Sequence, residues 1–87
     1  MKILKEMCDE ENEGLISLMG ERVTLMCANY FYTGKLVGVN ETQVKLVDGG
    51  IVYETGSWDS RDWADYQEIS GSIYVRMSFV ESYGVRK

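Results

Sequence analysis

Residues 22–40 read RVTLMCANYFYTGKLVGVN and show the period of two that is typical of β-strands. Val23, Leu25 and Cys27 alternate with Thr24, Met26 and Ala28. This alternation predicts a strand whose first set of side chains is buried on one face. The Asn-Tyr pair at 29–30 interrupts this pattern, and a second strand is expected from Phe31 to Val39. These two strands are the start of the predicted sheet.

Two glycines lie inside the second expected strand, and glycine within a strand indicates a point of sharp curvature: Gly34 and Gly38. Further apolar runs follow at 43–47 and 51–54, separated by Asp48-Gly49-Gly50. Asp-Gly between apolar runs predicts a hairpin turn, because both residues tolerate the positive φ that such a turn requires. Residues 21–54 are therefore expected to hold the first three strands.

Residues 1–20 carry a different period. Apolar residues recur there at spacings of three and four, as in an amphipathic helix: Ile3, Leu4, Met7 and Cys8, and then Leu15, Ile16, Leu18 and Met19. Asn12 suits an N-cap and Gly20 suits a C-terminal stop, so the sequence predicts a helix over 12–19. A further helical stretch is expected before it.

The remaining residues divide into a loop and two strands. Residues 55–67, TGSWDSRDWADYQ, do not alternate and predict an inserted acidic loop. Alternation returns in 68–87, with a buried face expected at Ile73, Val75, Met77 and Phe79 and a last strand over 80–85. A helix and about five short antiparallel strands are too little for a sandwich. We therefore predict one all-β domain with an N-terminal helix, folded as a small, strongly bent five-stranded antiparallel barrel.

Composition excludes several classes of function. The 87 residues suffice for one domain and include no histidine, which excludes Ser-His and Cys-His nucleophile pairs and His-ligated metals. The sequence also contains no phosphate loop or metal-ligand cluster, so we expect no enzymatic activity, no cofactor and no metal. Cys8 and Cys27 form no CxxC motif and are expected to be reduced, buried thiols. No apolar run approaches the ~20 residues of a membrane span, and residues 1–8 are too polar for a signal peptide, so we expect no membrane contact and a cytoplasmic location.

The charge of the chain is unevenly distributed. Fourteen acidic residues against nine basic ones give a net charge of −5, which argues against non-specific attraction to nucleic acid. The acidic excess comes from residues 1–13 and 54–68, whereas the predicted barrel outside them has a slightly positive balance. The acidity therefore does not exclude a small basic site.

Two motifs resemble those of the Sm-like (LSm) protein family. Residues 34–40, Gly-Lys-Leu-Val-Gly-Val-Asn, resemble its first motif, which continues here through Val44, Leu46 and Asp48. Residues 75–80, Val-Arg-Met-Ser-Phe-Val, resemble its second motif, with Met77 in place of the usual glycine. The resemblance covers residues 12 to 85 and implies the SH3-like barrel of that family.

The resemblance also implies a function. It implies a homo-oligomeric ring of about five to seven subunits, in which the fourth strand of one copy pairs with the fifth strand of the next. Single-stranded RNA would be contacted near the pore by Asn40, Thr42, Gln43, Arg76 and Ser78. Two alternatives stay open, since Arg76 could pair with Glu81 and the residues at 40–43 could be ordinary turn residues.

Aromatic residues in the acidic loop support a second hypothesis. Trp58, Trp63 and Tyr66 lie among aspartates that would repel phosphate, so they suit a protein partner or packing onto the barrel better than stacked bases. The alternative function is a structural or protein-interaction ring that uses these residues and binds little or no RNA. The aromatic cluster Tyr30, Phe31 and Tyr32 could form a stacking platform, and we favour a role for it in the core or a subunit interface.

Overall fold

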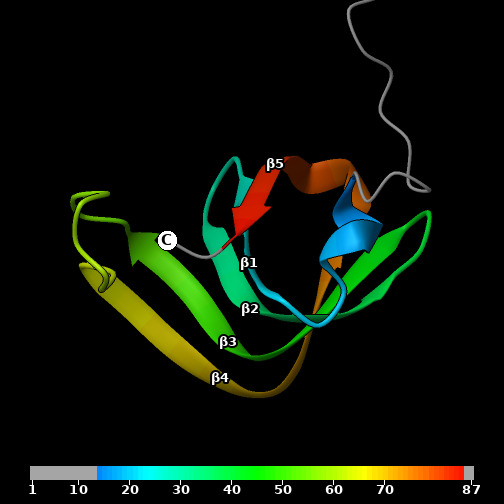
Figure 1. The fold of residues 1–87 in the computed structure, drawn as a ribbon. Coiled ribbons are helices and arrows are strands. Elements are labelled where there is room, and N and C mark those ends of the chain that lie inside the picture. The colour runs from blue at the N-terminus through cyan, green and yellow to red at the C-terminus, as the bar shows by residue number, and fades with distance from the viewer. Residues whose placement is uncertain (1–13, 86–87) are drawn as a thin grey trace, which may run out of the picture.

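The computed structural model describes residues 14–85, which form one antiparallel sheet of five strands (Figure 1). The strands are β1 (Arg22–Cys27), β2 (Phe31–Val39), β3 (Gln43–Glu54), β4 (Asp65–Arg76) and β5 (Val80–Val85). There are two short 3-10 helices among the described residues. The first, η2 (Leu15–Leu18), precedes β1, and the second, η3 (Met77–Phe79), joins β4 to β5. The prediction of an all-β fold with five antiparallel strands is confirmed.

The order across the sheet is β4-β3-β2-β1-β5, so β4 and β5 are its two edges. The sheet bends strongly and wraps around its own concave side (Figure 1). Within residues 14–85, β4 and β5 are not paired with each other, and the sheet is therefore not closed into a barrel.

The hydrophobic core lies on the concave side of the sheet. Its fully buried side chains come from three neighbouring strands: Val23 and Leu25 of β1, Leu36 of β2, and Val44 and Leu46 of β3. Each such side chain contributes about 1.5–3 kcal/mol relative to an exposed one. The predicted buried face of β1 is confirmed, because Val23, Leu25 and Cys27 all belong to this core.

Two threonines are buried on the other face of β1 and β2, where the sequence predicts no burial. Thr24 and Thr33 are each 1% exposed and are directly paired across the strands. Thr24 donates a hydrogen bond to the Thr33 hydroxyl over 3.3 Å, and Thr33 donates to the Val23 carbonyl over 3.0 Å. Both hydroxyls are therefore satisfied without water.

The hairpin predicted at Asp48-Gly49-Gly50 is wrong, because β3 runs without a break from Gln43 to Glu54. The pairing of β3 with β4 shifts register between Val47 and Gly49, and Asp48 adopts a φ of 53°. This is a β-bulge with its first residue in the left-handed region, the conformation that also occurs in tight hairpin turns. A Cβ atom on Gly49 would overlap the Thr33 carbonyl oxygen, and one on Gly50 would overlap the Gln67 carbonyl oxygen. The glycines therefore allow three backbones to pass close together.

The N-terminal helix predicted over 12–19 is not present as an α-helix in the described residues. Within the described part of the predicted helix, 14–19, only the four residues of η2 are helical, and they form a 3-10 helix. Asn12 and the stretch before it lie outside the described residues. Gly20 has a φ of 88° and follows the helix, as expected for a C-terminal stop. No helix among the described residues is long and apolar enough to cross a membrane.

The second half of the chain differs from expectation at two places. The loop after β3 covers 55–64, because the first residue of β4 is Asp65, which pairs with Glu54. The predicted buried face is confirmed for Ile73 and Val75 only. Met77 to Phe79 leave the strand as η3, and Phe79 is 63% exposed. The period of two ends at Arg76 because the chain must turn there to reach the opposite edge of the sheet.

We predict that Gly49→Ala destabilises the fold by ~1–3 kcal/mol, because neither strand backbone can move aside for the new methyl group. Urea denaturation followed by circular dichroism would show a lower midpoint. The control is Gly84→Ala in β5, where a Cβ atom has no neighbour within 4 Å and the stability should change by less than ~0.5 kcal/mol. Equal midpoints for the two variants would contradict the close approach.

Candidate nucleic-acid interface

Four of the five residues expected to contact RNA meet at one end of the β3–β4 ladder. Gln43, the first residue of β3, is the direct partner of Arg76, the last residue of β4. The Met77 backbone N–H donates to the Thr42 carbonyl over 2.8 Å, which holds η3 against the β2–β3 turn. An open pocket of about 390 Å³ results, lined by Glu41, Thr42, Gln43, Arg76 and Ser78.

Asn40 has a different position from the other four. Its side-chain oxygen accepts three hydrogen bonds, from the Thr42 N–H (2.8 Å), the Thr42 hydroxyl (3.1 Å) and the Gln43 N–H (2.8 Å). Its own N–H donates to the Gln43 carbonyl over 3.0 Å. Asn40 therefore shapes the turn that presents Thr42 and Gln43, and its oxygen is already engaged there.

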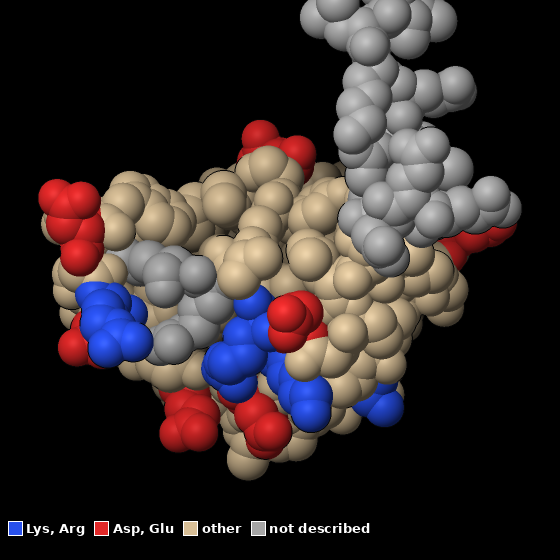
Figure 2. All heavy atoms as spheres, viewed as in Figure 1, with Lys and Arg blue, Asp and Glu red and all other residues tan. Residues whose placement is uncertain are grey.

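Among residues 14–85, Arg76 is the only cation that lines this pocket. It is exposed, and no carboxylate of residues 14–85 forms an ion pair with it, so the alternative pairing with Glu81 is not formed. Glu41 lines the same pocket and would weaken the attraction of the site for a phosphate. Figure 2 shows basic and acidic side chains close together on the face that it displays, so that face is not uniformly basic.

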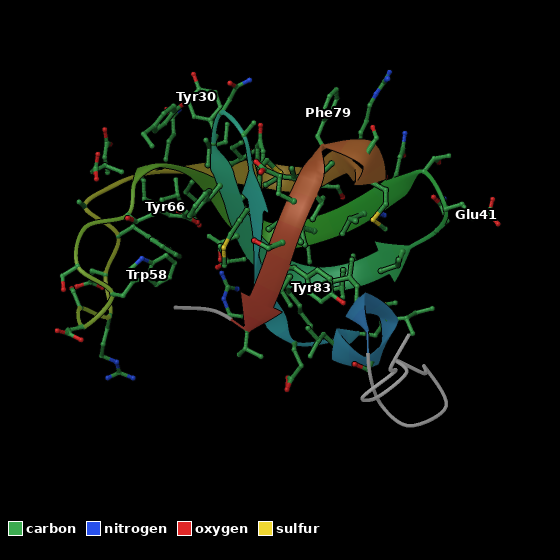
Figure 3. All side chains as sticks on the ribbon, turned by 90° about the horizontal axis from the view of Figure 1, so that it is seen from above. Tyr30, Glu41, Trp58, Tyr66, Phe79 and Tyr83 are labelled. Carbon is green, nitrogen blue, oxygen red and sulfur yellow. The ribbon has the colours of Figure 1, made fainter. Side chains whose placement is uncertain are left out.

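Trp58 and Trp63 of the acidic loop and Tyr66 of β4 lie at the other end of the molecule (Figure 3). In Figure 3, Trp58 and Tyr66 are far from Glu41, which marks the β2–β3 turn. The rings of Trp58 and Trp63 meet edge to face, with 5.7 Å between their centroids, and Trp58 is 54% exposed. A pocket of about 490 Å³ at this end is lined by Arg22, Thr33, Asp62, Trp63, Ala64, Asp65 and Tyr66. Trp63 and Tyr66 thus face β1 and β2 of their own sheet.

The Tyr30 cluster borders a third, mostly apolar pocket of about 320 Å³. Its lining comes from β1, the β1–β2 turn, β2, β4 and η3: Cys27, Ala28, Asn29, Tyr30, Tyr32, Tyr74, Val75 and Phe79. The rings of Tyr30 and Tyr53 meet edge to face at 5.2 Å between centroids. Burial, with a smaller contribution from the Glu81 carboxylate, raises the pKa of the Cys27 thiol, which favours its neutral form.

Sequence reasoning missed two residues of this region, Lys45 and Tyr74. They are direct partners on β3 and β4, and Lys45 Nζ lies 5.5 Å from the centroid of the Tyr74 ring. Their positions two residues from Gln43 and Arg76 are the signal that could have found them, because such residues share a face of a strand. No group of His, Cys, Asp or Glu side chains within the described part of the chain could hold a metal ion.

Comparisons with known proteins add no family to this description: no protein-family model matches the chain, and no curated protein matches it significantly.

We predict that Asn40→Ala lowers stability by ~1–2 kcal/mol, because three donors of the turn lose their acceptor. Asn40→Asp keeps an acceptor oxygen at the same place and should stay within ~0.5 kcal/mol of the unmodified protein at neutral pH. Thermal unfolding of both variants measures the difference. If Asn40→Ala were as stable as the unmodified protein, the three hydrogen bonds could not be what holds the turn.

Proposed function

We propose that this chain is a member of the Sm-like family that assembles into a homo-oligomeric ring and binds single-stranded RNA near the pore. The observation that carries the proposal is the pocket shared by Thr42, Gln43, Arg76 and Ser78. These residues come from two segments far apart in the sequence, and the same segments contain the two motifs that resemble the family. A cation beside hydroxyl and amide groups suits a phosphate and a base edge.

The sheet order supports the assembly. β4 is a 12-residue edge strand, and β5 forms the opposite edge. Each edge leaves a row of backbone N–H and C=O groups without strand partners, which a neighbouring copy can satisfy. Because the two edges are different surfaces of the molecule, their pairing is heterologous and can close into a ring.

The second candidate is a protein-interaction ring that uses Trp58, Trp63 and Tyr66. The observation that favours it is the exposure of Trp58 at the end of the β3–β4 hairpin, among Asp59 and Asp62. A large exposed aromatic residue is typical of a contact with another protein, and the neighbouring carboxylates would repel RNA. In this case Trp58→Ala would reduce partner binding while Arg76→Ala would not.

Fluorescence anisotropy with short labelled U-rich and A-rich RNAs tests the first candidate. We expect saturable binding at low salt that weakens steeply as salt rises, because phosphate contacts release counterions. Arg76→Ala should reduce the affinity at least about tenfold, or ~1.4 kcal/mol. The matched control is Arg61→Ala, which removes the same charge from the acidic loop and should bind like the unmodified protein. Equal losses in both variants, or no saturable binding at low salt, would overturn the RNA proposal.

Native mass spectrometry tests the ring separately. At micromolar concentration we expect one dominant closed species of about five to seven copies, since edge pairing that closes stops at a fixed number. Dilution should lower the amount of this species without producing a ladder of open intermediates. A spectrum with monomer alone would contradict the assembly but would leave the pocket on each subunit unaffected.

A further inference from the structure

Most basic residues of the described chain lie on the convex side of the sheet, opposite the core. Directly paired residues of antiparallel strands point to the same side, as do residues two apart on one strand. These rules define the outer basic face, which consists of three rows of partners: Arg22–Lys35–Val47–Ser72, Lys45–Tyr74 and Gln43–Arg76. The intervening residues Leu36, Leu46 and Ile73 point into the core, which confirms the direction of the rows.

The charge of this face differs from that of the whole chain. Its eight residues include Arg22, Lys35, Lys45 and Arg76 and no carboxylate. Arg61, in the loop, is the only other basic residue between 14 and 85. Lys35, Lys45 and Arg76 have no carboxylate partner among the residues that the structure describes. The outer basic face is thus complementary to a polyanion, although the chain as a whole is acidic.

A hollow on this face lies directly beside the Arg76 pocket. Its volume is about 250 Å³ and its lining is Gly38, Val39, Asn40, Gln43, Lys45 and Tyr74. Gln43 lines both this hollow and the Arg76 pocket, so the two are adjacent. A Cβ atom on Gly38 would lie only 3.3 Å from the Lys45 Cβ, and the missing side chain keeps the hollow open next to Lys45.

Tyr74 supplies an aromatic surface at the border of this hollow. Its side chain is 60% exposed, and the Lys45 ammonium group is near its ring. A hollow smaller than the ~300–1,000 Å³ of typical small-molecule sites suits a single flat ring. An exposed aromatic ring next to cations is the arrangement by which proteins bind single-stranded nucleic acid.

We propose that the outer basic face is a second RNA subsite, in which one base stacks on Tyr74 and the adjoining phosphates contact Lys45 and Lys35. The inference rests on the proposed function, because the strand would continue from the Arg76 pocket across Gln43. Tyr74 and Arg76 are two residues apart on β4, or about 6.6 Å along a strand, so neighbouring nucleotides can occupy the two places. The rows then direct the RNA towards Lys35, and the RNA path ends before Arg22, which donates a hydrogen bond to the Asp48 carbonyl and lines a pocket with Asp62 and Asp65.

The test compares RNA lengths and matched variants by fluorescence anisotropy. Tyr74→Ala should weaken binding of an RNA of about 12 nucleotides by tenfold or more, whereas Tyr74→Phe should bind normally because it keeps the ring. An RNA of about four nucleotides fills only one subsite. The Tyr74→Ala substitution should therefore reduce the affinity for this short RNA much less than the affinity for the long RNA. Lys45→Ala should weaken binding of the long RNA and lower the slope of log affinity against log salt by about one. Arg61→Ala is the charge control, and circular dichroism checks that each variant is folded.

The outcomes separate this inference from the proposed function. If Arg76→Ala abolishes binding of the long RNA while Tyr74→Ala and Lys45→Ala bind normally, the second subsite is wrong and the proposed function stands. If the unmodified protein binds no RNA but binds poly-glutamate, the face is a site for acidic protein and both proposals are wrong. The fluorescence of a 2-aminopurine base in the long RNA should be quenched by the unmodified protein and by Tyr74→Phe but not by Tyr74→Ala. Equal quenching by all three proteins would overturn the stacking of a base on Tyr74.

Discussion

The close approach of β2, β3 and β4 around Gly49 and Gly50 is the constraint on which the rest of the structure depends. At this point the backbone of β3 lies against the Thr33 carbonyl of β2 and the Gln67 carbonyl of β4. The register shifts of β3 against both neighbours fall at the same level. A sheet with a bulge shared by two ladders bends sharply there, and this bend allows one small sheet to enclose its own core.

The candidate site is a consequence of that bend and of the long β3–β4 ladder. The ladder brings Gln43 and Arg76 together, and the Asn40 turn and η3 then add Thr42 and Ser78 to the same pocket. The same ladder positions Lys45 and Tyr74 beside each other on the convex side. Trp58 of the acidic loop lies at the far end of the hairpin from Glu41 of the β2–β3 turn (Figure 3), whereas Arg22 lines a pocket together with Asp62 and Asp65 at the loop end.

Much of the fold follows from local pattern, and the failures have physical reasons. The bounds of β2 agree with the prediction and those of β1 differ by one residue at each end, because successive side chains of a strand point to opposite faces and apolar residues on the core face give a period of two. The hairpin predicted at Asp48 is wrong, since a bulge of this type and a hairpin turn both place a residue at positive φ and the local sequence does not distinguish them. Phe79 is exposed although it continues the apolar alternation, because the chain leaves the sheet after Arg76. Burial of Thr24 and Thr33 depends on a hydroxyl pair formed between two strands.

The sequence by itself determined β1 and β2 to within one residue, the buried face of β1, and the buried positions Ile73 and Val75 of β4. These features depend on side chains close together in the chain, whose periodicity reports directly on burial. Only the tertiary structure decided which strand ends meet, that β3 continues through its glycines, and that Lys45 and Tyr74 lie beside the Arg76 pocket. These features depend on register and bending between strands, and a register shift of one residue would move every side chain to the other face.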